Sequence, residues 1–125
     1  MCSNDCNNNQ KTNLCLILDI LQLKLSQLKT ELTRIHVIDN HDAKNALHQI
    51  ESMISALHEI LLSFGGCDVY KSDVSEEELE TIDSIGSEAD GFITACEYKY
   101  APHLLSPRVL SYLHRVGYNP NYVLN

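Results

Sequence analysis

The chain has 125 residues, a net charge of −8 and a hydrophobic content of 44%. This length fits one domain with one hydrophobic core. The acidic balance argues against direct binding to nucleic acid and against attachment to an anionic membrane by charge. Since the sequence contains no Trp and only two Phe, Leu and Ile must fill most of the core.

The most apolar stretch, residues 14–25, is too short and too polar to span a membrane, because Asp19, Gln22 and Lys24 interrupt it. No basic cluster precedes it and no small-residue cleavage site follows, so it does not read as a secretory signal. The five cysteines follow no framework pattern: Cys2, Cys6, Cys15, Cys67 and Cys96. They predict reduced thiols, with Cys15 and Cys96 buried and inert, in a cytoplasmic protein.

Three regions are predicted along the chain. Residues 1–12 are polar and rich in Asn, which is typical of a flexible tail. Residues 13–117 carry the helical patterns and form a single predicted domain, whose first helix Thr12 or Asn13 can cap. Residues 118–125 contain Asn119-Pro120-Asn121, which predicts an extended tail.

Residues 14–64 contain neither Gly nor Pro and predict two long amphipathic helices. Apolar residues recur at alternating steps of four and three, which keeps one apolar seam on one side of each helix. The first seam is Leu14, Leu18, Leu21, Leu25, Leu28, Leu32 and Ile35, and the second is Ala43, Leu47, Ile50, Ile54, Leu57, Leu61 and Phe64.

The two seams are out of phase, because eight residues separate Ile35 from Ala43 where an unbroken pattern needs seven. Short polar residues occupy the slip, and they favour turns and caps. We therefore predict an antiparallel hairpin that turns near residues 37–40. Asp39 or Asn40 is expected to cap the second helix.

The first half of the first helix is apolar beyond its seam, since Leu16, Ile17, Ile20 and Leu23 add a second hydrophobic side. A helix that is apolar nearly all round is buried nearly all round. One hairpin partner cannot cover it, so it needs the C-terminal helices, another subunit or both. These four residues are the predicted interaction residues, for a homo-oligomer, most simply a dimer, or for a partner protein.

Further helices are predicted after the hairpin. Gly65-Gly66 ends the second helix, and Ser75 with Glu78 forms a capping box that begins a third. The apolar stripe of the third helix contains Gly86, and neither Gly86 nor Gly91 favours an unbroken helix. Pro102 ends it, and Ser106-Pro107 begins a short fourth helix that buries Val109, Leu110, Leu113 and Val116 and stops at Gly117.

Charge is distributed unevenly. Residues 68–97 hold ten acids and one base, whereas Lys99, Arg108 and Arg115 are the only charged residues after position 97. The acidic helix and the basic, Tyr-rich end can complement each other within the chain or between subunits, or both are solvated surface. Glu76, Glu77 and Glu80 form a candidate acidic partner face.

His41-Asp42-Ala43-Lys44-Asn45 resembles the His-Asp-x-x-Asn box of some histidine kinases and phosphorelay phosphotransferases. The resemblance covers these five residues and the hairpin context. It implies His41 as a phosphoacceptor, with Asp42 orienting the ring. Here the box begins the second helix instead of lying inside the first, so the alternative is that both residues serve the turn and the helix start.

Neither a metal site nor an enzyme is predicted. Cys2 and Cys6 resemble half of a zinc site that His36, His41 or Cys67 would complete, but no second closely spaced pair is present. No phosphate-binding Gly-rich loop, nucleophile elbow or Glu-x-x-His pattern occurs. We expect no cofactor and no catalytic residues.

The sequence predicts an all-α helical bundle with coiled-coil-like packing: a long antiparallel hairpin plus one or two shorter C-terminal helices. The predicted function is a non-catalytic interaction module, such as an adaptor, regulator or inhibitor, that self-associates and binds a partner protein. Two alternatives stay open: a His phosphotransfer protein using His41, and an acidic mimic of nucleic acid using residues 68–97.

Overall fold

The fold was obtained as a computed structural model that describes residues 14–65 and 74–124. These ranges contain helices and no strand, which confirms the all-α bundle. In chain order the elements are α1 (Leu14–Arg34), α2 (His41–Ser63), α3 (Glu76–Tyr100), the short 3-10 helix η3 (Pro102–Leu104), α4 (Pro107–Arg115) and α5 (Asn121–Leu124).

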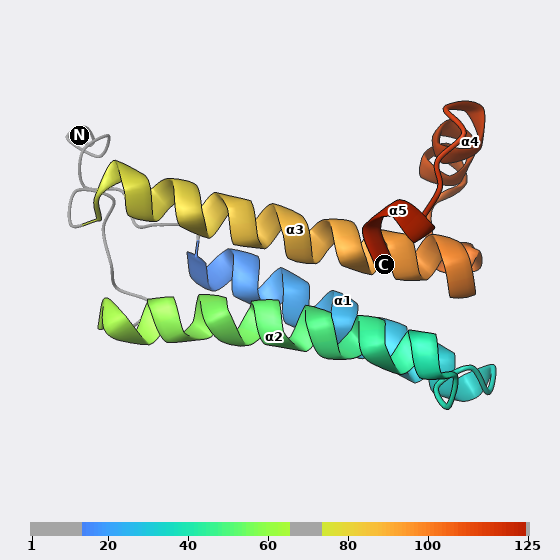
Figure 1. Cartoon of the computed structure of the whole chain (residues 1–125), viewed down its shortest axis with the longest axis horizontal. Coiled ribbons are helices and arrows are strands. Elements are labelled where there is room, and N and C mark those ends of the chain that lie inside the picture. The colour runs from blue at the N-terminus through green and yellow to red at the C-terminus, as the bar shows by residue number, and fades with distance from the viewer. Residues whose placement is uncertain (1–13, 66–73, 125) are drawn as a thin grey trace, which may run out of the picture.

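Helices α1 and α2 form the predicted antiparallel hairpin, and α3 lies along both of them (Figure 1). The two predicted seams supply most of the core. All of the first seam up to Leu32, and all of the second up to Leu61, is buried, while Ile35 and Phe64 at the helix ends are half-buried. The 3.6-residue period of the sequence therefore selects the correct side of each helix.

The turn between α1 and α2 is built from two local caps. His36 has a φ of +62°, and the amides of His36 and Val37 bond the carbonyls of Thr33 and Leu32 at 3.2 and 2.8 Å. This pattern is a Schellman cap. The Asn40 side chain then accepts a hydrogen bond from the Ala43 amide at 3.0 Å, so the predicted cap of α2 is confirmed.

Helix α3 is continuous over 25 residues and is longer than either arm of the hairpin. It begins at the predicted capping box, in which Ser75 and Glu78 bond each other's backbone amides, and ends before Pro102. Neither Gly86 nor Gly91 interrupts it. Its predicted stripe is buried from Ile82 to Cys96.

The C-terminal part differs from the prediction in two ways. Of the residues expected to be buried on α4, Leu113 is buried and Leu110 is half-buried, but Val109 and Val116 are exposed. The reason is that α4 projects away from the three long helices (Figure 1) and makes few contacts with them. Residues 121–124, expected to be extended, form the short helix α5, which contacts α3.

The two described cysteines differ from each other. Cys96 is a free thiol and fully buried, as expected. Cys15 is disulfide-bonded, so the prediction of a reduced thiol is wrong at this position. Because disulfides persist mainly in oxidising compartments, this bond counts against the expected cytoplasmic location. Cys2, Cys6 and Cys67, together with the predicted cap at Thr12 or Asn13, lie outside the described residues.

Candidate interaction surface

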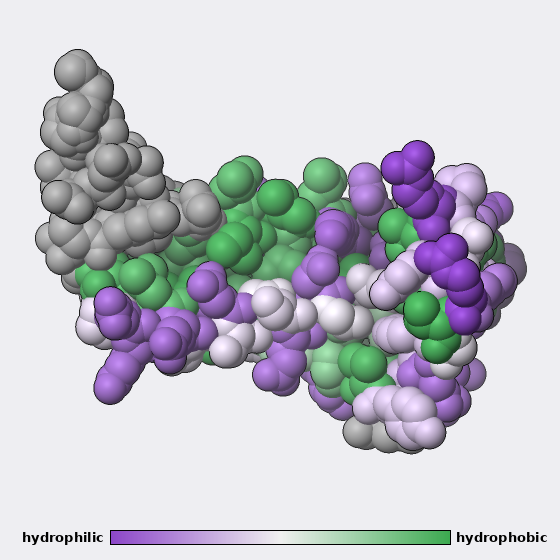
Figure 2. All heavy atoms as spheres, turned by 90° about the horizontal axis from the view of Figure 1, so that it is seen from above, coloured by the Kyte–Doolittle hydropathy of each residue, from purple (hydrophilic) through white to green (hydrophobic). Residues whose placement is uncertain are grey.

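An apolar surface remains open on α1. Leu16 is 58% exposed, Ile20 44% and Leu23 60%, whereas Ile17 is half-buried and packs against the core. Figure 2 shows hydrophobic side chains gathered on this face of the molecule, with hydrophilic side chains beside them. We call Leu16, Ile17, Ile20 and Leu23 the α1 patch. α2 and α3 cover one side of α1 and leave this side uncovered.

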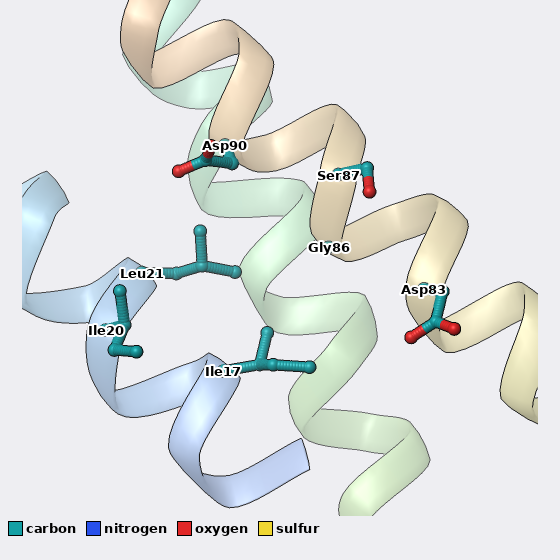
Figure 3. Close-up of a pocket in the computed structure, with 7 residues that line it drawn as sticks. All are labelled: Ile17, Ile20, Leu21, Asp83, Gly86, Ser87 and Asp90. Carbon is teal, nitrogen blue, oxygen red and sulfur yellow. The ribbon is translucent and has the colours of Figure 1, made fainter. Parts of the chain in front are cut away.

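A groove runs beside the α1 patch, between α1 and α3, with a volume of about 450 Å³ (Figure 3). Its α1 side is apolar and its α3 side carries polar residues. The lining consists of Ile17, Ile20 and Leu21 from α1 and Asp83, Gly86, Ser87 and Asp90 from α3. We call it the α1–α3 groove.

Gly86 shapes the floor of the groove. A Cβ at this position would lie 3.5 Å from Cγ2 of Ile17, which is ordinary van der Waals contact. The small residue therefore lets α3 approach Ile17 closely here, and the buried Leu21 also lines the groove. The sequence pattern placed Gly86 on the buried stripe but did not indicate that a groove would open beside it.

The polar wall of the groove carries negative charge. Asp90 forms an ion pair with Lys24 of α1 at 2.7 Å, and one turn before it on α3 is Ser87. Asp83 is exposed and forms no hydrogen bond or ion pair with the described residues. Nearby, burial raises the pKa of Glu97, Lys24 opposes this shift and Asp90 adds to it.

The predicted acidic face divides between two sides of α3. Glu76, Glu77 and Glu80 are all exposed. Glu77 lines a shallow depression against Ile60 of α2. Glu76 and Glu80 instead continue, at steps of four and three, the side of α3 that carries Asp83 and Asp90. One acidic stripe thus runs from the start of α3 to the α1–α3 groove.

Helix α4 presents a second open surface, and it is basic and apolar. Val109 is 42% exposed, and Tyr112 and Val116 are each 53% exposed. Arg108 and Arg115 flank these residues, and the guanidinium of Arg115 lies 5.4 Å from the centre of the Tyr112 ring. We call these five residues the α4 face. Val109 and Val116 were predicted to be buried, so the sequence did not indicate the α4 face.

Contacts on its opposite side hold α4 to α3. Leu113 is buried, and the rings of His114 and Tyr118 pack edge-on against Tyr98 of α3 at 5.5 and 5.2 Å. Burial also raises the pKa of Tyr118. This aromatic cluster explains why one side of α4 is anchored while the α4 face points to solvent.

The candidate phosphoacceptor lies at the start of α2. His41 and Asp42 are exposed, and Nε2 of His41 lies 3.3 Å from the side-chain amide nitrogen of Asn45. Among the described residues no acid forms an ion pair with the His41 ring. The His41 ring therefore contacts Asn45 and not an acid of the described residues, and phosphotransfer stays a prediction.

Two further properties of the described residues concern metal binding and membrane insertion. No group of three or more His, Cys, Asp or Glu side chains in residues 14–65 and 74–124 comes together in a way that could hold a metal ion. None of the helices described has the length and hydrophobicity needed to cross a membrane.

No family model, curated protein or solved structure matches this chain.

Proposed function

We propose that the protein is a non-catalytic helical interaction module, an adaptor, regulator or inhibitor, that self-associates and binds a partner protein. The observation that supports this proposal is the α1 patch. Three large aliphatic side chains, Leu16, Ile20 and Leu23, lie open on one face of α1, although the leucine seam of the same helix is buried. Contiguous apolar areas of this kind mark interaction sites in soluble proteins.

The energetics favour association through the patch. Apolar surface removed from water contributes roughly 25 cal/mol per Å², and interface energy concentrates in a few well-buried anchors. Leu16 and Leu23, seven residues apart, are about two helical turns from each other. A second helix laid along α1 therefore covers both side chains and Ile20 between them.

The test replaces the open leucines with polar residues of similar size. The wild-type chain is expected to dimerise at tens of micromolar in size-exclusion chromatography with light scattering, and Leu16→Gln with Leu23→Gln is expected to be monomeric. Circular dichroism should show unchanged helicity, because both side chains are largely exposed.

Leu62→Gln is the matched control, since Leu62 is 62% exposed on α2 and lies outside the patch. It should associate like the wild type. A wild-type chain that is a clean monomer at these concentrations would remove the self-association. Equal effects of Leu62→Gln and the α1 double variant would show that the α1 patch has no special role.

The cytoplasmic location also remains a proposal. The unpatterned cysteines favour a reducing compartment, whereas the disulfide at Cys15 favours an oxidising one. Alkylation of thiols during lysis, followed by mass measurement of the denatured chain, separates the two. A reducing compartment would leave all five cysteines alkylated, and two fewer alkylated cysteines would show that the disulfide is present in the cell.

A second candidate function rests on the exposed acids in the first turns of α3. Glu76, Glu77 and Glu80 are exposed and form no ion pair with the described residues, so their charge is available to a basic partner. An acidic mimic of nucleic acid would bind such a partner in a salt-sensitive manner. Charge reversal of these three residues should abolish that binding, and unchanged binding would exclude this role.

A further inference from the structure

Within the described ranges, no segment covers the α1–α3 groove or the α4 face, and the chemistry of the two surfaces is complementary. The groove has an apolar wall on α1 and an acidic wall on α3. The α4 face has an apolar row, Val109, Tyr112 and Val116, beside two arginines. Each surface therefore combines an apolar area with charged residues, and the charges are negative in the groove and positive on the α4 face.

The charges also match in spacing. Asp83 and Asp90 are seven residues apart on α3, and Arg108 and Arg115 are seven residues apart on α4. Seven residues correspond to about 10.5 Å along a helix axis, so the two arginines have the same spacing as the two acids. Asp90 already pairs with Lys24, which leaves Asp83 as the groove acid without a partner among the described residues.

The chain's own α4 does not occupy the groove. Leu113, His114 and Tyr118 anchor α4 at the far end of α3, against Tyr98, and it projects from the bundle there (Figure 1). The groove lies beside Gly86, twelve residues earlier on α3. The α4 helix of the same molecule is therefore held away from the groove.

We propose that helix α4 of a second copy of this chain docks in the α1–α3 groove. In this complex Val109 and Tyr112 pack on Ile17 and Ile20, and Arg108 and Arg115 face the acidic wall. This inference rests on the proposed self-association, and it identifies α4 of one copy and the α1–α3 groove of the other as the contacting surfaces. Because each copy has one groove and one α4 face, a twofold dimer satisfies both copies at once.

The first experiment reverses the charge on each side separately. The groove variant is Asp83→Lys with Ser87→Lys, two exposed residues that form no hydrogen bond or ion pair with the described residues. The α4 variant is Arg108→Glu with Arg115→Glu. Each alone should raise the dissociation constant of the dimer about tenfold or more, measured by analytical ultracentrifugation, because like charges then meet.

The decisive measurement mixes the two variants. In a heterodimer the lysines of one groove meet the glutamates of one α4, and the native aspartates of the other groove meet the native arginines. Both contacts are complementary again, so the mixture should associate at least as well as the wild type. If mixing restores association, both variants must also be folded, because an unfolded chain could not form either contact.

A matched control is available on α2. Ser55→Lys with Glu59→Lys changes the net charge by the same amount at the same four-residue spacing, and both positions are exposed and outside the groove. This variant should associate like the wild type. If it weakens association as much as the groove variant does, the effect is one of net charge and the proposed contact is wrong.

Photo-crosslinking provides an independent test. A photoreactive phenylalanine in place of Tyr112, in a mixture of light and heavy-isotope chains, should link α4 of one copy to residues 17–21 or 83–90 of another. Intermolecular links confined to other segments would overturn the proposal.

The outcomes separate this inference from the proposed function. A wild-type dimer that neither charge reversal weakens, or variants that stay apart when mixed, would overturn docking of α4 and leave self-association through the α1 patch intact. A wild type that is monomeric throughout would overturn both.

Discussion

Glu31 joins two elements through a single carboxylate. It accepts hydrogen bonds from Nε of Arg34 at 2.8 Å and from the ring of His103 in η3. The Arg34 hydrogen bond, followed by that from His103, lowers the pKa of Glu31 from 4.5 to about 2. This residue thereby ties the segment after α3 to the end of α1.

The depressed pKa predicts how stability depends on acid. The ionised form is favoured in the folded state, so the contribution of Glu31 is fully present above about pH 4.5 and is lost as pH falls toward about 2. Glu31→Gln should lower the melting temperature near neutral pH, and the difference from the wild type should shrink through this window. A difference that stays constant down to the lowest pH would contradict the prediction.

Cys96 illustrates burial acting on a reactive group. It is fully buried, and desolvation, with a smaller effect from Glu97, raises its pKa from 9.0 to about 12. Because the thiolate is the reactive form, the native Cys96 thiol should react about a thousandfold more slowly with iodoacetamide than in denatured protein. Mass spectrometry of the Cys96 peptide over time measures this. Equal rates before and after denaturation would show that the site is open.

At the scale of elements, α1 and α4 both end in a Schellman cap, but the residue with positive φ differs between the two caps. His36 after α1 and Gly117 after α4 have φ values of +62° and +68°. In each cap the following amide bonds the carbonyl five residues back, Val37 to Leu32 and Tyr118 to Leu113. Gly accepts this conformation without strain, whereas a residue with a Cβ does not.

This pair predicts opposite effects of opposite substitutions. His36→Gly should raise the free energy of unfolding by about 0.5–1 kcal/mol, and Gly117→Ala should destabilise the α4 cap by a similar amount. Urea unfolding measures the first, and amide hydrogen exchange in α4 measures the second. If His36→Gly destabilises the chain instead, the His36 side chain contributes more than its backbone strain costs.

The turn between α1 and α2 depends on Asn40. Its side chain satisfies the Ala43 amide at the start of α2, and Asn40→Ala should therefore cost about 1 kcal/mol of stability. Asp39→Ala is the control, because the Asp39 side chain is 92% exposed and makes only a 3.9 Å contact with Lys44. Urea unfolding that ranks the two variants equally would show that the cap is unimportant.

At the scale of the whole molecule, one core joins the three long helices. Leu28 of α1, Leu57 of α2 and Ile93 of α3 are completely buried in it. A core shared in this way should make α1, α2 and α3 unfold together. α4 is attached through Leu113 and the Tyr98 cluster and is expected to open more readily.

Leu57→Ala should lower the free energy of unfolding by about 2–5 kcal/mol, because it removes buried methyl groups and leaves a cavity. Leu62→Ala, at a position that is 62% exposed on the same helix, should change it by no more than about 0.5 kcal/mol. Urea denaturation followed by circular dichroism compares the two. Similar costs would mean that α2 is not oriented as described.

Much of the fold could be predicted because its signals are local. The seams from Leu14 to Leu32 and from Ala43 to Leu61 were identified by period alone, and Asn40, Ser75 and Ser106 marked helix starts by their side-chain chemistry. The site was predicted only in part. Leu16, Ile20 and Leu23 were identified as surplus hydrophobic residues, but nothing local indicated that Asp83 and Asp90 would line a groove with Ile20.

The sequence by itself determined the extent of the three long helices and of α4, and which side of each long helix is buried, since periodicity and capping act within a few residues. It did not indicate the short helix α5 at residues 121–124. Only the tertiary structure decided which of the hydrophobic residues outside the core remain exposed to solvent. The groove beside Gly86 depends on how closely α1 approaches α3, and the exposure of Val109 and Val116 depends on the anchoring of α4 by Tyr98. Both result from contacts between residues far apart in the chain, which no local pattern encodes.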